Sequence, residues 1–187
     1  VFAWLKSHYY LILFISQYRD NLAGDQFNTE KVLLPKILDY CERKKLKFNI
    51  LGASLKESIN EKNFYTKILN TNNWIFLKRK SPNNYNVVDK FENIIFIDST
   101  LGYEAAARGR KVAVFSSRRM TINGPLELFA WPHKMKKKDF YYSDSCSEHE
   151  IKRVLNNIAS CSEKKWKQTF LPKLNRICPY IKDKKDM

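Results

Sequence analysis

Short apolar runs alternate with amphipathic stretches along the first 115 residues of the chain. Runs of this length, bounded by turn residues, are typical of strands buried on both faces of a parallel sheet. The pattern predicts five strands, at residues 9–15, 48–51, 74–77, 94–97 and 112–115.

Amphipathic stretches between these runs predict the helices 29–44, 61–69, 87–91 and 101–108. In the first of them Glu30 suits the first turn, and Gly109 ends the last. Strands that alternate with helices indicate βαβ units with right-handed crossovers. We therefore expect a Rossmann-like, three-layer α/β domain with a mainly parallel sheet of five to six strands.

The pattern changes after the fifth strand. Residues 116–142 are irregular, and a loop of that length in a compact domain is usually functional. Ser147 and Glu150 then form a capping box before a strongly periodic helix, and a second helix begins near Ser162. We expect residues 1–160 to form the Rossmann-like domain and residues 161–187 to be a helix and charged tail packed on it.

Charge is the main departure from average composition, with 34 basic residues, 19 acidic residues and a net charge of +15. Such a balance favours a polyanionic partner, although 25 Lys against 9 Arg also fits A/T-rich codon bias. The run Lys134–Lys138 suggests either peripheral contact with an anionic membrane or a solvated loop. No apolar run reaches the roughly 20 residues of a membrane span, so we expect a cytoplasmic protein, peripheral at the inner membrane face if that contact forms.

Cysteine and histidine are sparse and scattered. The four cysteines predict reduced, separately packed thiols, and neither residue type has metal-ligand spacing. We expect no cofactor and no metal.

The most informative segment runs from Ile94 to Ser117 as strand, helix and strand. The helix should point its N-terminus at the carboxyl edge of the sheet, where free N–H groups and the helix dipole attract anions. Ser99 and Thr100 add hydroxyls there, Gly102 allows a phosphate to approach the backbone, and Glu104 is placed to hold ribose hydroxyls. The alternative is that the hydroxyls only cap the helix and the glycine only allows close packing.

Other strand ends carry basic and hydroxyl side chains of the kind that bind a phosphorylated ligand. Ligands of open α/β sheets bind at this edge. Each charge is otherwise an ordinary solvated loop residue, and the chain has no G-x-G-x-x-G and no P-loop motif. The additional candidates are Arg19, Ser54, Lys80, Ser116 and Arg118.

The segment 98–116, DSTLGYEAAARGRKVAVFS, resembles the donor-side segment of bacterial surface-carbohydrate biosynthesis proteins. These are similar to GT-B glycosyltransferases of capsule and lipopolysaccharide assembly. The resemblance runs from about Phe14 to Phe170, although Ser-Thr-x-Gly-x-Glu cores occur in several sugar-nucleotide enzymes.

The resemblance implies a Rossmann-like domain that binds a nucleotide-sugar donor, with its phosphate at Ser99, Thr100 and Gly102 and its ribose at Glu104. The implied acceptor is a glycan or a lipid-linked sugar. A GT-B enzyme has two Rossmann-like domains and this chain has room for one. We therefore expect the domain to be incomplete without an acceptor domain, and no catalytic base is named.

Two other functions stay open. A sugar-nucleotide epimerase has the same architecture but needs acid and base groups that the three histidines are poorly placed to supply. A basic nucleic-acid-binding module would use the +15 charge, but no RNP, KH or helix-turn-helix signature is present, so we expect no specific nucleic acid partner.

Overall fold

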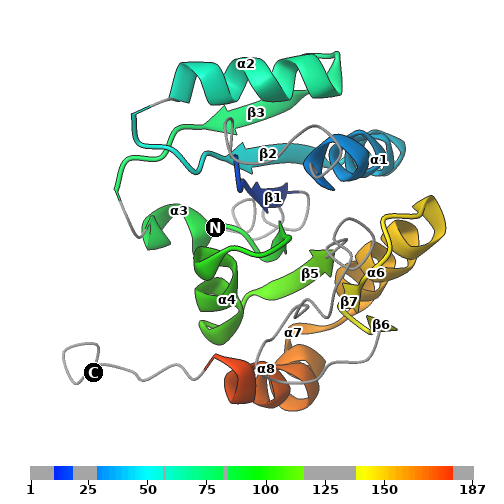
Figure 1. The fold of residues 1–187 in the computed structure, drawn as a ribbon. Coiled ribbons are helices and arrows are strands. Elements are labelled where there is room, and N and C mark those ends of the chain that lie inside the picture. Colours follow the sequence, from blue (N-terminus) through cyan, green and yellow to red (C-terminus); the bar gives the residue numbers. More distant parts are fainter. Residues whose placement is uncertain (1–10, 19–28, 57, 82–83, 116–137, 179–187) are drawn as a thin grey trace, which may run out of the picture.

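The computed structural model describes residues 11–18, 29–56, 58–81, 84–115 and 138–178. Within them a seven-stranded sheet forms the centre of the molecule (Figure 1). Its strands are β1 Leu11–Ile15, β2 Lys47–Leu51, β3 Trp74–Leu77, β4 Asn93–Phe96, β5 Lys111–Phe115, β6 Lys138–Asp139 and β7 Tyr142–Ser143.

The strand order is β3-β2-β1-β4-β5-β7-β6. All neighbours are parallel except β6 and β7, which pair antiparallel. From β1 the chain builds outward through β2 to β3, then returns to place β4 on the other side of β1. This reversal between β1 and β4 is the position at which open α/β sheets bind their ligands.

Helices cover both faces of the sheet, as right-handed crossovers require when the strand order reverses. α1 packs against α2 and α6 on one face, and α4 packs against α8 on the other (Figure 1). The short α3 lies in the connection from β3 to β4. The bounds are α1 Thr29–Arg43, α2 Ser58–Leu69, α3 Tyr85–Val88, α4 Thr100–Ala107, α6 Glu148–Ser160 and α8 Leu171–Ile177.

The C-terminal segment crosses from one face of the sheet to the other. Two short pieces, α7 Glu163–Lys165 and the π-helical turn η3 Trp166–Phe170, lead from α6 to α8. Pro172 lies in the first turn of α8 and has no N–H to donate, which suits the widened turn before it. Trp166 is fully buried against Tyr141 and Phe170, so this segment is anchored in the common core.

The predicted Rossmann-like α/β class is confirmed, with all five predicted strands found to within one residue where they are described. The N-cap half of the predicted capping box is confirmed, since the Ser147 hydroxyl accepts the N–H of Glu150, but the Ser147 N–H bonds Ser145 and the Glu150 carboxylate bonds Arg153. The prediction that residues 116–142 are irregular throughout was wrong at its end. Residues 138–143 add β6 and β7 at the edge of the sheet, because Tyr142 continues the core beside β5.

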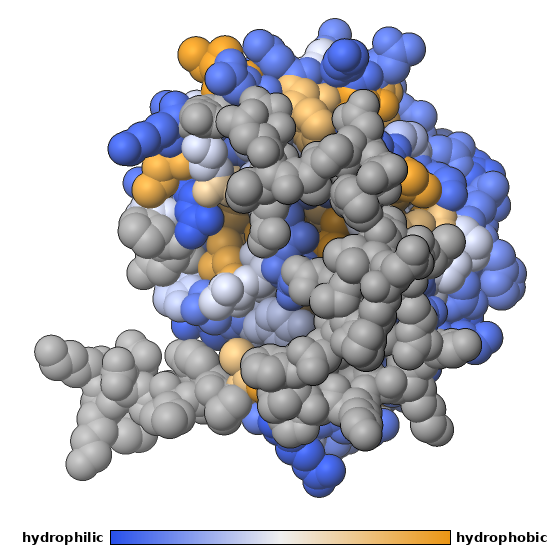
Figure 2. Space-filling model, in the orientation of Figure 1, coloured by the Kyte–Doolittle hydropathy of each residue, from blue (hydrophilic) through white to orange (hydrophobic). Residues whose placement is uncertain are grey.

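Most exposed side chains are hydrophilic, with few large apolar exceptions among the described residues. Figure 2 shows hydrophobic side chains reaching the surface over α2, where Ile59 is 74 % exposed. None of the helices in the described ranges has both the length and the apolar character needed to cross a bilayer. The four cysteines are free thiols, as predicted.

Candidate functional site

The carboxyl ends of β1 and β4 border the point of reversal in the sheet. Ser16 to Tyr18 follow β1, and Ile97 to Ser99 lead from β4 into α4. Because β1 and β4 pair in parallel, both segments emerge at the same edge. The first turn of α4 therefore lies at the crevice in which a ligand of this fold would bind.

The N-cap and first turn of α4 carry two hydroxyl side chains and no acidic one, and Asp98 directly precedes the N-cap. Ser99 is the N-cap residue, but its hydroxyl makes no capping hydrogen bond. Thr100, the first helical residue, is exposed. Helix geometry directs the first N–H groups of α4 toward the crevice, and no carboxylate in its first turn offsets their positive field. This end of the helix has the chemistry to accept a phosphate.

Gly102 is explained by packing inside the protein. It is buried, and a Cβ atom at its position would lie 2.3 Å from Cγ of Phe96. The Phe96 ring on β4 thus presses on the backbone of α4 where a side chain would otherwise stand. The glycine is required for this contact, and its contact with a phosphate stays a prediction.

Glu104 lies one turn beyond Thr100 and is half-buried. Burial, and next the negative charge of Glu104, raise the pKa of Cys178, which caps the end of α8. Glu104 therefore lies on the side of α4 that approaches α8. A ribose held by Glu104 would have to lie on that side as well, and this role stays a prediction.

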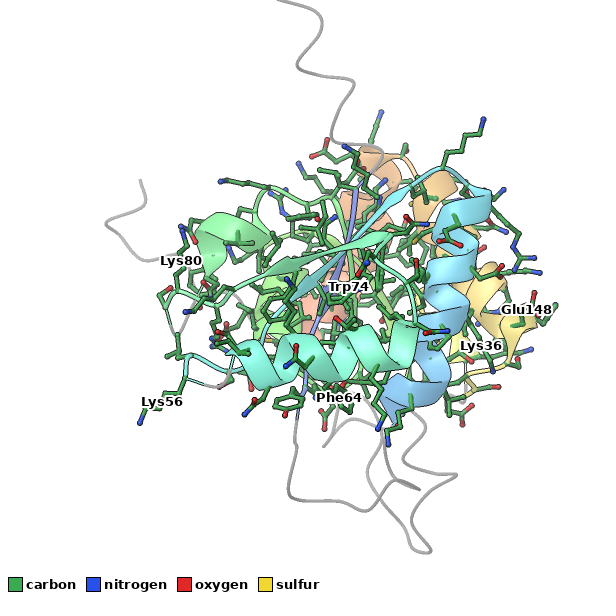
Figure 3. The ribbon with its side chains drawn as sticks, turned by 90° about the horizontal axis from the view of Figure 1, so that it is seen from above. Lys36, Lys56, Phe64, Trp74, Lys80 and Glu148 are labelled. Carbon is green, nitrogen blue, oxygen red and sulfur yellow. The ribbon has the colours of Figure 1, made fainter. Side chains whose placement is uncertain are left out.

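Two other predicted residues follow β2 and β3. The hydroxyl of Ser54 accepts the N–H of Lys56 at 3.2 Å in a local turn, and Lys80 is exposed. Figure 3 shows Lys56 and Lys80 extending outward on the same side of the molecule. Strand spacing places the end of β2 roughly 10 Å and the end of β3 roughly 14 Å from that of β4. Ser54 and Lys80 are thus on the predicted edge but separated from α4 by β1.

A buried polar network at the ends of β1 and β2 was missed by the sequence reasoning. Ser16 Oγ lies 2.5 Å from Tyr65 Oη and 2.5 Å from Oε1 of Glu61. The Tyr65 hydroxyl also lies 2.9 Å from Oε2 of Glu30. All four side chains are almost completely buried, and burial together with the Glu30 charge raises the pKa of Tyr65 well above 10.

The same two carboxylates bind backbone N–H groups of the strand-end loops. Glu30 accepts the N–H of Gln17 at 2.8 Å, and Glu61 accepts those of Ala53 at 2.7 Å and Ser54 at 3.1 Å. These amides are therefore already bonded within the protein. The sequence feature that could have revealed this network is an acidic residue in the first turn of both helices, Glu30 in α1 and Glu61 in α2. The sequence reasoning used only Glu30.

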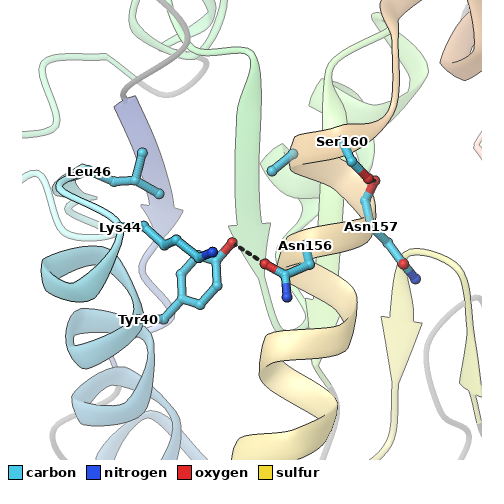
Figure 4. Close-up of a pocket in the computed structure, with 7 residues that line it drawn as sticks. Tyr40, Lys44, Leu46, Asn156, Asn157 and Ser160 are labelled. Carbon is cyan, nitrogen blue, oxygen red and sulfur yellow. Dashed lines mark hydrogen bonds between the residues drawn. The ribbon is translucent and has the colours of Figure 1, made fainter.

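A groove of about 550 Å³ lies at the opposite edge of the sheet, between the C-terminal halves of α1 and α6 (Figure 4). Across it Tyr40 donates a hydrogen bond to Oδ1 of Asn156 at 2.9 Å. The predicted site residues do not line it. Its side chains are Tyr40, Lys44, Leu46, Asn156, Asn157, Ala159 and Ser160.

The buried thiols are not candidates for nucleophilic catalysis. Burial raises the pKa of Cys41 to about 12 and that of Cys146 to about 11. Thiols with such values are protonated near neutral pH and react poorly. Across the described ranges, no three His, Cys, Asp or Glu side chains gather as metal ligands would.

Three predicted site residues, Arg19, Ser116 and Arg118, lie outside the described residues, as does the greater part of the basic run Lys134–Lys138. Their roles stay predictions.

One comparison with known proteins gave a match over nearly the whole chain. The model of a family described as "putative O-antigen biosynthesis protein" matches residues 4–186. Comparisons with curated proteins and with solved structures gave no significant match.

Proposed function

The chain belongs to this O-antigen biosynthesis family, and from that premise we propose that it binds a nucleotide-sugar as the donor half of a GT-B-like glycosyltransferase. The observation that carries the proposal is the N-terminus of α4, which lies at the reversal of the strand order with two hydroxyls and no acidic residue in its first turn. A donor phosphate placed there would accept N–H and hydroxyl hydrogen bonds.

The proposed role in sugar transfer is stabilisation of the leaving nucleotide. When the bond between sugar and phosphate breaks, negative charge develops on the phosphate oxygens. Preorganised N–H donors and the dipole of α4 would stabilise that charge more strongly than they stabilise the bound donor. Ser99 and Thr100 would orient the phosphate, and Arg118 is the proposed cationic contributor, since Lys80 lies farther along the edge. The acceptor, a glycan or lipid-linked sugar, would enter from a second domain.

The epimerase alternative is less well supported by the same geometry. A dinucleotide in a Rossmann fold sits with its pyrophosphate at the helix after the first strand. In this chain the N–H of Gln17 after β1 is bonded to Glu30, and Glu30 is in the first turn of α1. A pyrophosphate would have to displace that carboxylate and face its charge.

The nucleic-acid alternative is weakened by the pairing of basic side chains. In the described ranges several of them contact carboxylates, which offsets their positive charge locally. The paired residues are Arg43, Arg108, Arg110, Lys111, Lys152, Arg153 and Lys167.

The proposal is tested by thermal shift and calorimetry with CMP, UDP, GDP, ADP, their sugar conjugates and a short RNA. Binding is measured because the proposal concerns the donor half alone. We expect one nucleotide to stabilise the protein selectively, by about 2.7 kcal/mol at one hundred times its Kd. Ser99→Ala and Thr100→Ala should weaken binding. Ser160→Ala, an exposed hydroxyl at the opposite edge of the sheet, is the matched control.

The outcome that would contradict the proposal is binding of RNA, steeply weakened by salt, together with no response to any nucleotide. That result would make the nucleic-acid function the leading one.

A further inference from the structure

Two buried carboxylates reach from helices to the loops that end β1 and β2. Glu61, in the first turn of α2, is fully buried and has three donors within hydrogen-bond distance, the N–H groups of Ala53 and Ser54 and the hydroxyl of Ser16. It thereby joins the end of β1 to the end of β2. Glu30 holds the same end of β1 from α1 through the N–H of Gln17.

The glycine after β2 leaves space for the Glu61 carboxylate. Gly52 follows β2, and a Cβ atom there would lie 2.9 Å from Oε2 of Glu61 and 2.9 Å from the Phe76 ring. With any larger residue there, the Glu61 carboxylate or the Phe76 ring would have to shift. Tyr65 lies one turn along α2 from Glu61, and its hydroxyl is hydrogen-bonded to the hydroxyl of Ser16. The carboxylate, the two hydroxyls and the glycine therefore form one connected arrangement.

These loops border the crevice in which the proposed donor would bind. Loop N–H groups at strand ends are the usual partners of ligand phosphates in this architecture. Here those of Gln17, Ala53 and Ser54 are bonded to side chains of the same chain. Of the helices that start at this edge, α1, α2 and α6 have an acidic first turn, whereas α4 and the single-turn α3 have none.

We propose that Glu61, assisted by Glu30, is a positioning residue for the nucleotide-sugar: it fixes the loops after β1 and β2 and occupies their anion-binding amides, which directs the donor phosphate to α4. This inference rests on the proposed function. On this inference Glu61 and Glu30 do not contact the nucleotide, but they affect where it binds and how tightly.

The test compares Glu61→Gln with Lys111→Met. Glutamine keeps the shape of the side chain but replaces one acceptor oxygen by an NH₂ donor, so at least one of the loop N–H groups faces a donor. Lys111 is equally buried and bonded, to Glu92 and to the carbonyl of Cys161, but lies at the start of β5 on the opposite edge. Both variants should lower Tm.

We expect Glu61→Gln to weaken the nucleotide identified by the panel at least tenfold, and Lys111→Met to change its Kd by less than twofold. In ¹H–¹⁵N spectra of the ligand-free protein, Glu61→Gln should also shift the amides of Ala53 and Ser54 and speed their hydrogen exchange. Equal Kd values for both variants and the wild type would overturn the inference while leaving the proposed function standing.

If the wild type binds no nucleotide, the proposed function fails first, and the positioning role falls with it. Unchanged amides of Ala53 and Ser54 in Glu61→Gln would refute the loop-fixing role independently of any ligand. The two failures are therefore distinguishable.

Discussion

The two halves of the carboxyl edge of the sheet differ in how their free backbone N–H groups are treated. At the ends of β1 and β2, carboxylates of Glu30 and Glu61 satisfy the loop amides from within. At the end of β4, α4 begins with hydroxyls and without an acidic side chain in its first turn. The first half is complete without a ligand, whereas the second retains the positive end of a helix at the point where the strand order reverses. On the proposed function, the first half would be scaffold and the second would be the binding surface.

The largest change in the free energy of unfolding is expected from Glu61→Ala. The substitution leaves one buried hydroxyl and two partly buried N–H groups without their acceptor, at about 1 kcal/mol each, so a loss of about 3 kcal/mol is expected. Urea denaturation at pH 7 measures it. Ser99→Ala is the matched change in the other half and should cost less than about 0.5 kcal/mol, because the hydroxyl makes no capping bond. Equal losses in the two variants would remove the distinction between the halves.

A smaller loss is expected from Gly102→Ala. Alanine favours a helix over glycine by about 1 kcal/mol, but here its methyl group would overlap the buried ring of Phe96, and overpacking costs about 1–3 kcal/mol. We expect a net loss of about 1 kcal/mol in urea denaturation.

A double-mutant cycle identifies the cause of that loss. Phe96→Leu makes room beside residue 102, so combining it with Gly102→Ala should cost less than the sum of the two single variants. Strict additivity would show that contact with the Phe96 ring is not the cause of the loss.

Much of this architecture could be predicted from the sequence because it depends on local patterns. Apolar runs located the five long strands, and Ser147 with Glu150 located the start of α6. β6 and β7 were missed because two-residue strands leave no periodic signal and depend on pairing with β5. Gly102 was given a phosphate-contacting role because a sequence does not show which ring packs on the helix.

The buried network could not be predicted for the same physical reason. Ser16 meets Glu61 and Tyr65 across 45 and 49 residues, and only the parallel pairing of β1 with β2 brings them together. An acidic residue in a first turn is usually a solvated dipole partner, and nothing local marks one that turns inward. The candidates at α4 were accessible because strand, cap and helix are consecutive in the sequence.

A third helix, α6, also has an acidic first turn, and its contribution to the free energy of unfolding should depend on pH. Glu150 in the first turn of α6 bonds the Arg153 guanidinium with both oxygens, and this bond lowers the pKa of Glu150 from 4.5 to about 2. Its contribution is present above the unfolded pKa and is lost as pH falls from about 5 toward 2. Wild type and Glu150→Gln should differ by about 1–2 kcal/mol at pH 7 and converge near pH 2 in urea denaturation. A constant difference would exclude this carboxylate as the source.

A small gain in unfolding free energy is expected when the second half is made to resemble the first. Thr100→Asp places a carboxylate at the exposed start of α4 and should stabilise the protein by about 0.5 kcal/mol through the helix dipole. The same charge would repel a donor phosphate, so nucleotide affinity should fall at least tenfold by calorimetry. Thr100→Asn, which adds the shape without the charge, should lose much less. A variant that gains stability while it loses the ligand would show that the missing acidic residue of α4 is what leaves this helix end available for binding. Unchanged affinity in Thr100→Asp would place the phosphate elsewhere.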